Sequence, residues 1–325
     1  MKTLSRARGT VALTAILTLP LAAATAAHAS PAGAKHPGHK AGHHAAHKAG
    51  HKAGAKAAER RRHHKHRHAH RHHKKAHPKK VRSAATRADV LAGVPAGTTL
   101  KPSGSLTITT PGATVNGLDI KGTLTIKANN VTVRNTRVTS GTAYNVVTVA
   151  DGATGVTLDH VTINGTGLNG TAGANGTYGP GTYNAVEVTG VENGFVPSSG
   201  ATITNSWVHH LASPGSPHYD GVQIDGARSN ITLTNSTIDL SDQTQTSAVM
   251  VDNYFGAATN IVVSGNRLLG AGYTVYADGQ FNNSPLTVTY ANNRIGQGRW
   301  GYSLRRGATV TWSGNTDDKT GQPIS

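Results

Sequence analysis

Three aspartates recur at nearly equal intervals in the second half of this 325-residue chain. Asp225, Asp252 and Asp278 each follow a short apolar stretch, and Arg305 follows Asp278 after a further interval of the same length. If one interval is one turn of a repeating β structure, adjacent strands are about 4.8 Å apart and the carboxyl groups form a row. Carboxylates at that spacing repel one another unless a cation, an arginine or a shared proton relieves the repulsion. The spacing therefore predicts a cation site or a set of coupled acid and base groups.

The side chains expected beside this row follow from the alternation of a β-strand. In residues 222–225 the first and third positions are apolar and face inward, so the second and fourth face outward. The outward second position holds Gln223, Met250 and Tyr276 in successive copies, and these side chains are suited to contact a sugar ring. An earlier copy, residues 186–189, places the acid Glu187 in the same column.

Further polar groups flank the row. His218, Tyr219 and Asp220 precede the strand that leads to Asp225, and Arg306 adds positive charge at the far end. We expect Tyr219, Asp220 and Arg306 to contact a substrate. The imidazole of His218 titrates near neutral pH, so it is a candidate for moving a proton.

The elements that must position these residues are short repeated strands. Their aligned apolar positions recur at intervals of about one turn, with one interval that is clearly longer, and they are Val133, Leu158, Ile203, Leu233, Val263, Val288 and Val310. One such turn cannot close a hydrophobic core alone and becomes stable by stacking on its neighbours. The spacing indicates a solenoid, with an insertion in the long interval between Leu158 and Ile203, and an ordinary β-sandwich is the competing fold.

One turn of each repeat carries asparagine. Asn135, Asn205 and Asn235 fall at the same position, where asparagine tolerates a left-handed backbone and its amide can bond to the next copy. His160 occupies this column as well. We therefore interpret His160 as a structural turn residue.

These repeats resemble those of the right-handed parallel β-helix proteins, the pectate lyase-like superfamily, which includes secreted pectate lyases and polygalacturonases. The resemblance spans about Ala88 to Asn315 and rests on strands followed by Asn and Ser or Thr, such as residues 231–238. It implies an all-β domain over residues 86–325, folded as a single-stranded right-handed parallel β-helix. The same solenoid supports several chemistries, so it does not specify one activity.

The resemblance implies two kinds of active site. In pectate-lyase-like members acids on this face hold Ca²⁺, which would make Glu187, Asp225, Asp252 and Asp278 metal ligands and Arg305 or His218 the base. In polygalacturonase-like members the three aspartates would compete for acid and base roles, Asp252 among them. The chain lacks the Gly-His-Gly and Arg-Ile-Lys runs of that second group.

Two functions from different classes fit these residues. The first is a secreted polysaccharide-processing enzyme, a Ca²⁺-assisted lyase that acts on an acidic glycan. The alternative is a non-catalytic extracellular solenoid that binds glycan or cell wall. For either one we expect a monomer.

Residues 1–29 are typical of an export signal. Lys2, Arg6 and Arg8 precede the apolar stretch 11–24, and small residues at Ala27 and Ala29 suit a signal peptidase. After this segment no apolar run approaches the roughly 20 residues that a membrane helix requires. The chain has no cysteine, which excludes disulfides and Cys-ligated metal centres. We therefore expect a secreted, extracellular protein.

Residues 30–85 form a low-complexity arm of Ala, Gly, Lys, Arg and His that we expect to be disordered. The chain up to residue 85 has 19 Lys and Arg against one acid, a charge of +18, whereas the remainder has 13 against 14, a charge of −1. The arm is expected to bind a cell-wall polyanion or other acidic polysaccharide, or to act as a solvated spacer. Its 14 histidines also predict transient binding of transition metals. The nearly neutral domain is not expected to recognise nucleic acid.

Overall fold

The structure, a computed structural model, describes residues 88–166, 174–215 and 217–325. All described residues belong to one compact unit. The predicted signal segment 1–29 and basic arm 30–85 lie outside the described residues. In the described part, no helix has the length and apolar character needed to cross a membrane.

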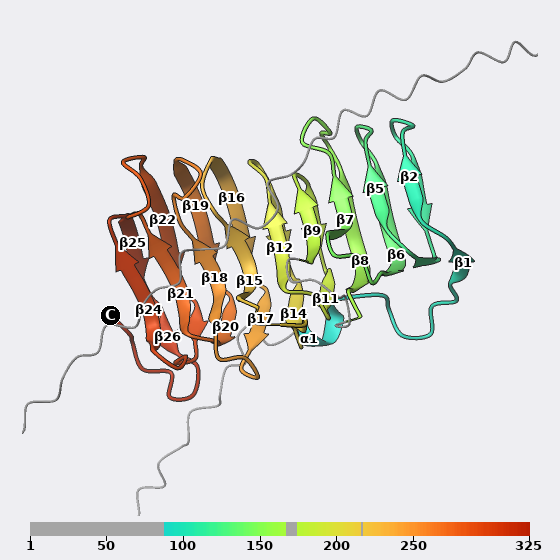
Figure 1. Cartoon of the computed structure of the whole chain (residues 1–325). Coiled ribbons are helices and arrows are strands. Elements are labelled where there is room, and N and C mark those ends of the chain that lie inside the picture. Colours follow the sequence, from blue (N-terminus) through green and yellow to red (C-terminus); the bar gives the residue numbers. More distant parts are fainter. Residues whose placement is uncertain (1–87, 167–173, 216) are drawn as a thin grey trace, which may run out of the picture. The chain divides into compact units, whose positions relative to one another are not determined.

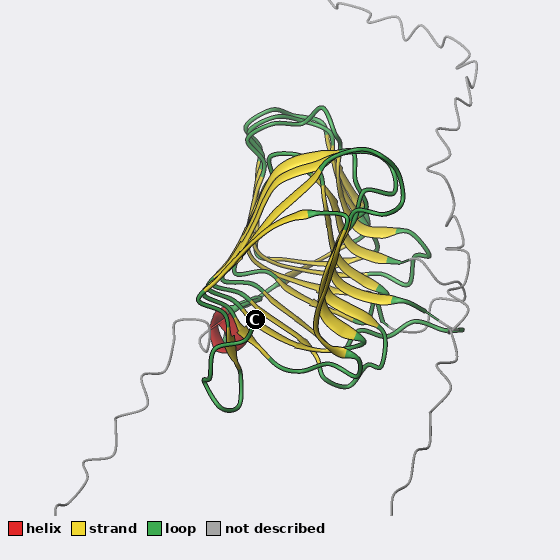
Figure 2. Ribbon diagram, turned by 90° about the vertical axis from the view of Figure 1, so that its left-hand side faces the viewer, coloured by secondary structure: helices red, strands yellow, loops and turns green. Residues whose placement is uncertain are grey.

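The described chain is a solenoid of parallel strands, which confirms the predicted parallel β-helix fold (Figure 1). Each turn contributes one strand to a nine-stranded sheet and, in most turns, two strands to a seventeen-stranded sheet. Figure 2 looks along the stack, so that strands of successive turns lie behind one another and the loops gather at the corners. Side chains at equivalent positions of successive turns are therefore neighbours.

The nine-stranded sheet carries the predicted acidic residues, and we call it the site sheet. Its strands are β2 (Leu106–Ile108), β5 (Leu124–Ile126), β7 (Asn145–Val149), β9 (Asn175–Gly179), β12 (Asn193–Pro197), β15 (Tyr219–Ile224), β18 (Thr246–Val251), β21 (Tyr273–Asp278) and β24 (Gly301–Arg306).

The seventeen-stranded sheet covers the remaining sides of the solenoid, and the helix α1 (Ala88–Leu91) precedes it in the chain. Its strands are β1 (Lys101–Ser103), β3 (Thr114–Asn116), β4 (Leu118–Lys121), β6 (Thr132–Thr139), β8 (Thr157–Asn164), β10 (Thr182–Asn184), β11 (Glu187–Thr189), β13 (Thr202–Thr204), β14 (Trp207–His209), β16 (Arg228–Thr234), β17 (Thr237–Leu240), β19 (Ala258–Ser264), β20 (Arg267–Gly270), β22 (Leu286–Ala291), β23 (Arg294–Ile295), β25 (Thr309–Ser313) and β26 (Thr316–Asp317).

The long interval between Leu158 and Ile203 holds a complete turn, so the expected insertion is wrong. Tyr183 on β10 pairs with Leu158 on one side and with Ile203 on the other, and its ring is fully buried. An aromatic residue therefore fills the core position that aliphatic residues occupy in the neighbouring turns. The predicted alignment of core positions is also wrong near the C-terminus, because Val263 pairs with Tyr290 and not with Val288.

The predicted turn residues adopt left-handed backbone. The φ angles of Asn135, His160, Asn205 and Asn235 are 46°, 53°, 53° and 49°. The Asn205 amide donates to Asn184 Oδ1 at 2.9 Å, and the Asn135 amide donates to Asn116 Oδ1 at 3.0 Å, each on the preceding turn. His160 is thus confirmed as a turn residue.

A buried asparagine ladder lies one residue after this left-handed turn position. Asn293 Oδ1 accepts hydrogen bonds from the backbone N–H and the amide of Asn266, at 3.0 and 3.1 Å. The Asn293 amide in turn donates to Asn315 Oδ1 and to the carbonyl of Val263, each at 2.9 Å. All three asparagines are essentially inaccessible to solvent, so the ladder satisfies backbone groups that the tight turn would otherwise leave unpaired.

We expect Asn293→Ala to lower the free energy of unfolding by about 3 kcal/mol, because it leaves several buried donors and acceptors without partners. The exposed Asn283 provides a matched control, and Asn283→Ala should have almost no effect. Chemical denaturation monitored by circular dichroism measures both variants. Equal stability of the two variants would show that the ladder does not support the turn.

Candidate functional site

The register of the site sheet brings Asp225, Asp252 and Asp278 together on adjacent strands. Ile224 pairs with Val251, the residues just before the first two aspartates, and Asp252 pairs directly with Asp278. Strands so paired are about 4.8 Å apart. We call these three aspartates the acidic row.

Asp278 is committed to an ion pair with Arg306, its neighbour on β24. The guanidinium donates from Nε to Oδ1 at 2.9 Å and from Nη2 to Oδ2 at 2.6 Å. The Gln280 N–H also donates to Oδ1, at 3.3 Å. Because both oxygens of Asp278 have partners, its carboxylate closes the end of the row rather than offering a free reactive group. Arg306, predicted to contact a substrate, is held in the same pair.

Asp225 and Asp252 are the members of the acidic row without an ion pair; Asp225 is partly exposed, whereas Asp252 is buried, with 1 % of the residue exposed. Burial raises the pKa of Asp252 to about 8, and the charges of Asp225 and then of Asp278 add to the increase, while the Tyr254 N–H opposes it. Burial also raises the pKa of Asp225 to about 6, against the opposing charge of Arg228. At neutral pH Asp252 is therefore protonated and Asp225 is ionised, so one is an acid and the other a base.

The two carboxyl groups differ in their hydrogen bonds. Asp252 Oδ1 accepts a hydrogen bond from the Tyr254 N–H at 2.9 Å. This bond closes a turn in which the carboxyl group caps the start of the next loop. Asp225 Oδ1 is buried and has no hydrogen-bond donor among the described residues. A proton on the neighbouring Asp252 is a donor suited to that oxygen.

Asp220 is buried, which corrects the prediction that it contacts a substrate. Only 3 % of the residue is exposed, and Oδ1 accepts the Ser247 hydroxyl at 2.7 Å. Burial raises its pKa well above the usual range, which favours the neutral carboxyl group. Its partner in the sheet register, Asn193, has a buried Oδ1 without a donor in the described structure, and a neutral Asp220 could supply that proton. Asp220 thus has a structural role, in which it links β15 to the neighbouring strands of the site sheet.

Aromatic side chains adjoin the acidic row. Tyr276 is largely buried, with 8 % exposed, and burial raises the pKa of its phenol. Its ring lies 5.7 Å from that of Tyr273, which lies 5.9 Å from the indole of Trp300. Because Trp300 is 47 % exposed, it offers more surface to a sugar ring than the predicted Tyr276 does.

The remaining predicted contact residues lie around this surface. Gln223 and Met250 are partly exposed at paired positions of β15 and β18. The Tyr219 hydroxyl forms a hydrogen bond within the protein, in which it accepts the Ser213 N–H at 3.1 Å. His218 is exposed, and its backbone N–H donates to Glu192 Oε1 at 2.9 Å, which fixes the loop rather than the imidazole.

Glu187 does not belong to the acidic row, and that prediction is wrong. It lies on β11 of the seventeen-stranded sheet and pairs with Trp207 of β14. Its carboxylate contacts His209 Nε2 at 3.1 Å and accepts the Thr162 hydroxyl at 3.0 Å. The hydrogen bond from His209 lowers the pKa of Glu187. The error follows from the unrecognised turn between Leu158 and Ile203, which shifted the alignment by one strand.

Arg305 also lies away from the row, so its predicted position is wrong by one place in the sequence. It pairs with Ala277, an inward position, whereas Arg306 pairs with Asp278. The Arg305 guanidinium lies 4.5 Å from the centre of the Trp312 ring, a cation–π contact in the last turn. Arg305 is therefore not placed to act as a base beside Asp225 and Asp252.

The predicted calcium ligands do not fit a metal site. Glu187 is on the other sheet, and Asp278 gives both oxygens to Arg306. Across the described ranges, no group of three His, Asp or Glu side chains is placed to hold a metal ion. Two carboxyl groups remain, fewer than the oxygen ligands that Ca²⁺ prefers from a protein.

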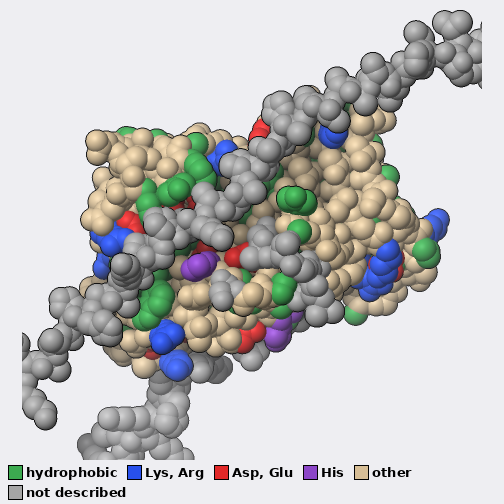
Figure 3. Space-filling model, viewed as in Figure 1, with side chains coloured by type: hydrophobic (Ala, Val, Ile, Leu, Met, Phe, Trp, Pro, Cys, Tyr) green, Lys and Arg blue, Asp and Glu red, His purple; other side chains and the backbone are tan. Residues whose placement is uncertain are grey.

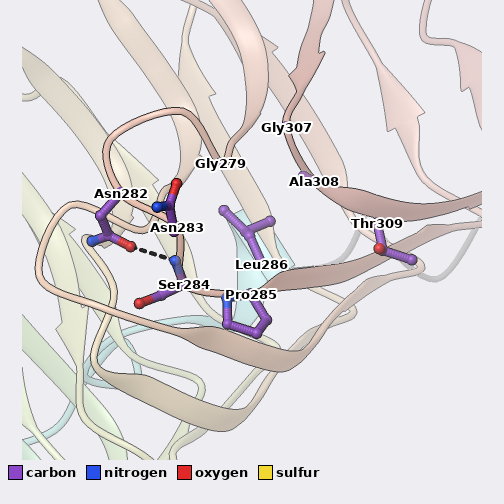
Figure 4. Close-up of a pocket in the computed structure, with 9 residues that line it drawn as sticks. All are labelled: Gly279, Asn282, Asn283, Ser284, Pro285, Leu286, Gly307, Ala308 and Thr309. Atoms are coloured by element: carbon purple, nitrogen blue, oxygen red, sulfur yellow. Dashed lines mark hydrogen bonds between the residues drawn. The ribbon is translucent and has the colours of Figure 1, made fainter.

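An open pocket of about 580 Å³ adjoins the end of the row. Its lining starts directly after each member of the Asp278–Arg306 pair. Figure 4 shows Asn282, Asn283 and Ser284 on one side and Gly307, Ala308 and Thr309 on the other, with Pro285 and Leu286 between them. In Figure 3, charged side chains are few on the visible face, and acidic and basic side chains lie next to each other toward the end that carries β24.

Two residues of the site were not predicted from the sequence, Tyr273 and Arg228. Tyr273 and Tyr276 are separated by an odd number of positions, so strict alternation would put the two rings on opposite faces. Arg228 lies at the start of the strand that follows Asp225, and only a short turn separates the two residues. This short separation in the sequence could have predicted that Arg228 lies near Asp225.

We expect Asp252→Asn to stabilise the protein at alkaline pH. The folded state holds the Asp252 proton more tightly than the unfolded state, so wild type loses stability as the pH rises from about 4 to about 8. The variant does not lose this stability, so its free energy of unfolding gains on that of wild type by up to about 1.4 kcal/mol for each pH unit. Melting temperatures at pH 5 and pH 8 measure it, with Asp242→Asn on an exposed loop as the control. An advantage of Asp252→Asn that does not grow with pH would contradict the raised pKa.

Comparisons with known proteins give only distant similarity. No family model and no curated protein matches the chain. Among solved structures, it is similar to the catalytic unit of a thermostable GH87 alpha-1,3-glucanase from Streptomyces thermodiastaticus strain HF3-3, with 16% identity, a TM-score of 0.38, and coverage of 66% of this chain and 50% of that one. It is also similar to the tailspike protein gp49 of Acinetobacter baumannii bacteriophage Fri1, a capsular polysaccharide depolymerase, with 13% identity, a TM-score of 0.31, and coverage of 62% and 52%. The chain thus spans about half the length of each, and an activity must be argued from the site itself.

Proposed function

We propose that this protein is a secreted polysaccharide-processing enzyme that cleaves glycosidic bonds with Asp252 as acid and Asp225 as base. The observation that carries the proposal is the pair of adjacent carboxyl groups, one protonated and one ionised at neutral pH. Cleavage of a glycosidic bond by hydrolysis requires that combination, because the leaving oxygen must receive a proton while a carboxylate assists on the other side.

The surroundings of the pair suit a polymeric sugar. The acidic row follows the stacking direction of the strands, and the partly exposed Gln223 and Met250 and the exposed Trp300 lie near it. An aromatic face and hydrogen-bonding groups next to an acid–base pair are the usual components of a sugar-binding surface. A linear chain could contact several turns at once.

Hydrolysis fits these residues better than the calcium-assisted elimination expected from the sequence. Elimination would need a set of acids for the cation and a base for the proton next to the uronate carboxyl. Among the described residues the acids do not assemble into that set, and Arg305 contacts Trp312 instead. Elimination is therefore kept as an outcome of the activity assay.

A panel of neutral glucans, pectate, alginate and glycosaminoglycans tests the activity, with Ca²⁺ and with chelator. We expect new reducing ends without absorbance from unsaturated sugars, independent of Ca²⁺. Asp252→Asn and Asp225→Asn should each lower the rate about a hundredfold or more, and Asp242→Asn should not change it. Unsaturated products that need Ca²⁺ would favour a lyase, and unchanged rates in the first two variants would refute the acid–base assignment.

The basic arm supports a separate proposal about location. Residues 30–85 carry a net charge of +15 and precede a domain of charge −1, so we propose that they attach the secreted protein to acidic cell-wall polymers. This attachment would also serve the alternative function, a glycan-binding solenoid without catalysis.

Deletion of residues 30–85 should release the protein from isolated cell walls. Binding of the full chain should weaken steeply between about 50 and 200 mM salt, because polyanion binding of this kind releases counterions. A pull-down assay over that salt range measures both effects. Attachment that persists in the deletion variant, or that ignores salt, would exclude the arm as the tether.

A further inference from the structure

Arg228 brings a positive charge close to Asp225 from the seventeen-stranded sheet, and its side chain forms no ion pair among the described residues. It begins β16, directly after the turn that follows Asp225, and its charge opposes the increase in the pKa of Asp225. Within the described part of the chain, no carboxylate lies at ion-pair distance from Arg228. It differs in this from Arg306 at the other end of the row, which is neutralised by Asp278.

The Arg228 side chain is held in place by Tyr178 rather than by an acid. Its Nη2 donates to the Tyr178 hydroxyl at 3.1 Å, and its guanidinium carbon lies 5.9 Å from the centre of that ring. Tyr178 is on β9, and β12 lies between β9 and β15 in the site sheet. The guanidinium therefore reaches back toward strands that precede Asp225, and Tyr178 uses one of its five N–H donors.

The charges of the site leave room for an anion. Burial raises the pKa of Asp252 and of Asp220, which favours their neutral forms, and Asp278 is neutralised by Arg306, so Asp225 is the remaining negative charge near the positive charge of Arg228. A face that contains four aspartates thus has a net charge near zero. A negatively charged sugar would not be repelled, and Arg228 offers it free donors in the planar arrangement that matches a carboxylate.

We propose that Arg228 is the subsite for an anionic substituent of the sugar chain, a carboxylate or a sulfate, one to two strands from the Asp225–Asp252 pair. The inference rests on the proposed function, because it places the charged unit of the substrate next to the bond that is cleaved. The Tyr178 hydroxyl orients the guanidinium toward this unit.

Binding to the full chain carrying Asp252→Asn tests the proposal without turnover. The probes are oligosaccharides of galacturonate, mannuronate and glucuronate, each with its carboxyl-reduced neutral counterpart, and a sulfated galactan oligosaccharide. Isothermal titration calorimetry gives the Kd for Arg228→Gln and for the control Arg134→Gln. Arg134 is exposed on β6 of the other sheet, so both variants lose one charge and any attraction by the basic arm cancels in the comparison.

We expect Arg228→Gln to weaken binding of an anionic probe about tenfold to a hundredfold, and Arg134→Gln to leave it unchanged. The neutral counterpart should bind both proteins equally. Tyr178→Phe keeps the charge but loses its orientation and should give a smaller loss, which separates the subsite from a folding defect. A loss confined to uronates or to the sulfated probe identifies the anion.

Equal binding by the two arginine variants, or no binding of any anionic probe, would overturn the subsite. A failure of the cleavage assay does not affect this measurement, because it records binding alone. Conversely, cleavage of a neutral glucan without anion binding would refute the role of Arg228 and leave the acid–base pair in place.

Discussion

Parallel stacking at a fixed spacing is the constraint on which the rest of this structure depends. Each strand lies about 4.8 Å from its equivalents in the turns before and after it, so identical positions become contacts. A favourable side chain repeated at such a position forms a ladder, as Asn266, Asn293 and Asn315 do in the core. A charged side chain repeated there must instead be neutralised.

The acidic row shows two ways of meeting that requirement. Asp278 meets it with an ion pair, because the next turn supplies Arg306 at the paired position. Asp252 is buried and has a carboxyl group on each side, and within the described chain no arginine pairs with it, so its pKa is raised and it retains its proton. The unequal chemistry of identical residues thus follows from the identity of their neighbours in the stack. A protonated acid next to an ionised one is also what general acid–base catalysis requires.

The sequence was sufficient to predict the coil and the acidic row, because the nearly equal intervals between Asp225, Asp252 and Asp278 are visible without coordinates. It also indicated the left-handed turns, since asparagine recurs where only a few residues tolerate such backbone. It failed where a core residue changed type: Tyr183 replaced an aliphatic side chain and concealed a whole turn, so Glu187 was assigned to the wrong sheet. The exchange of Arg305 for Arg306 arose from a shift by a single position, which reverses the face of a strand.

Neither the protonation of Asp252 nor the burial of Asp220 could be predicted from the pattern, because both depend on how completely the folded chain excludes solvent from these side chains. The central claim is that adjacent strands hold one protonated and one ionised carboxyl group. Carbon-13 NMR titration of the aspartate carboxyl groups, assigned with the Asp225→Asn and Asp252→Asn variants, measures this directly. We expect one group that titrates near pH 6 and one near pH 8. Titration of both groups near pH 4 would contradict it.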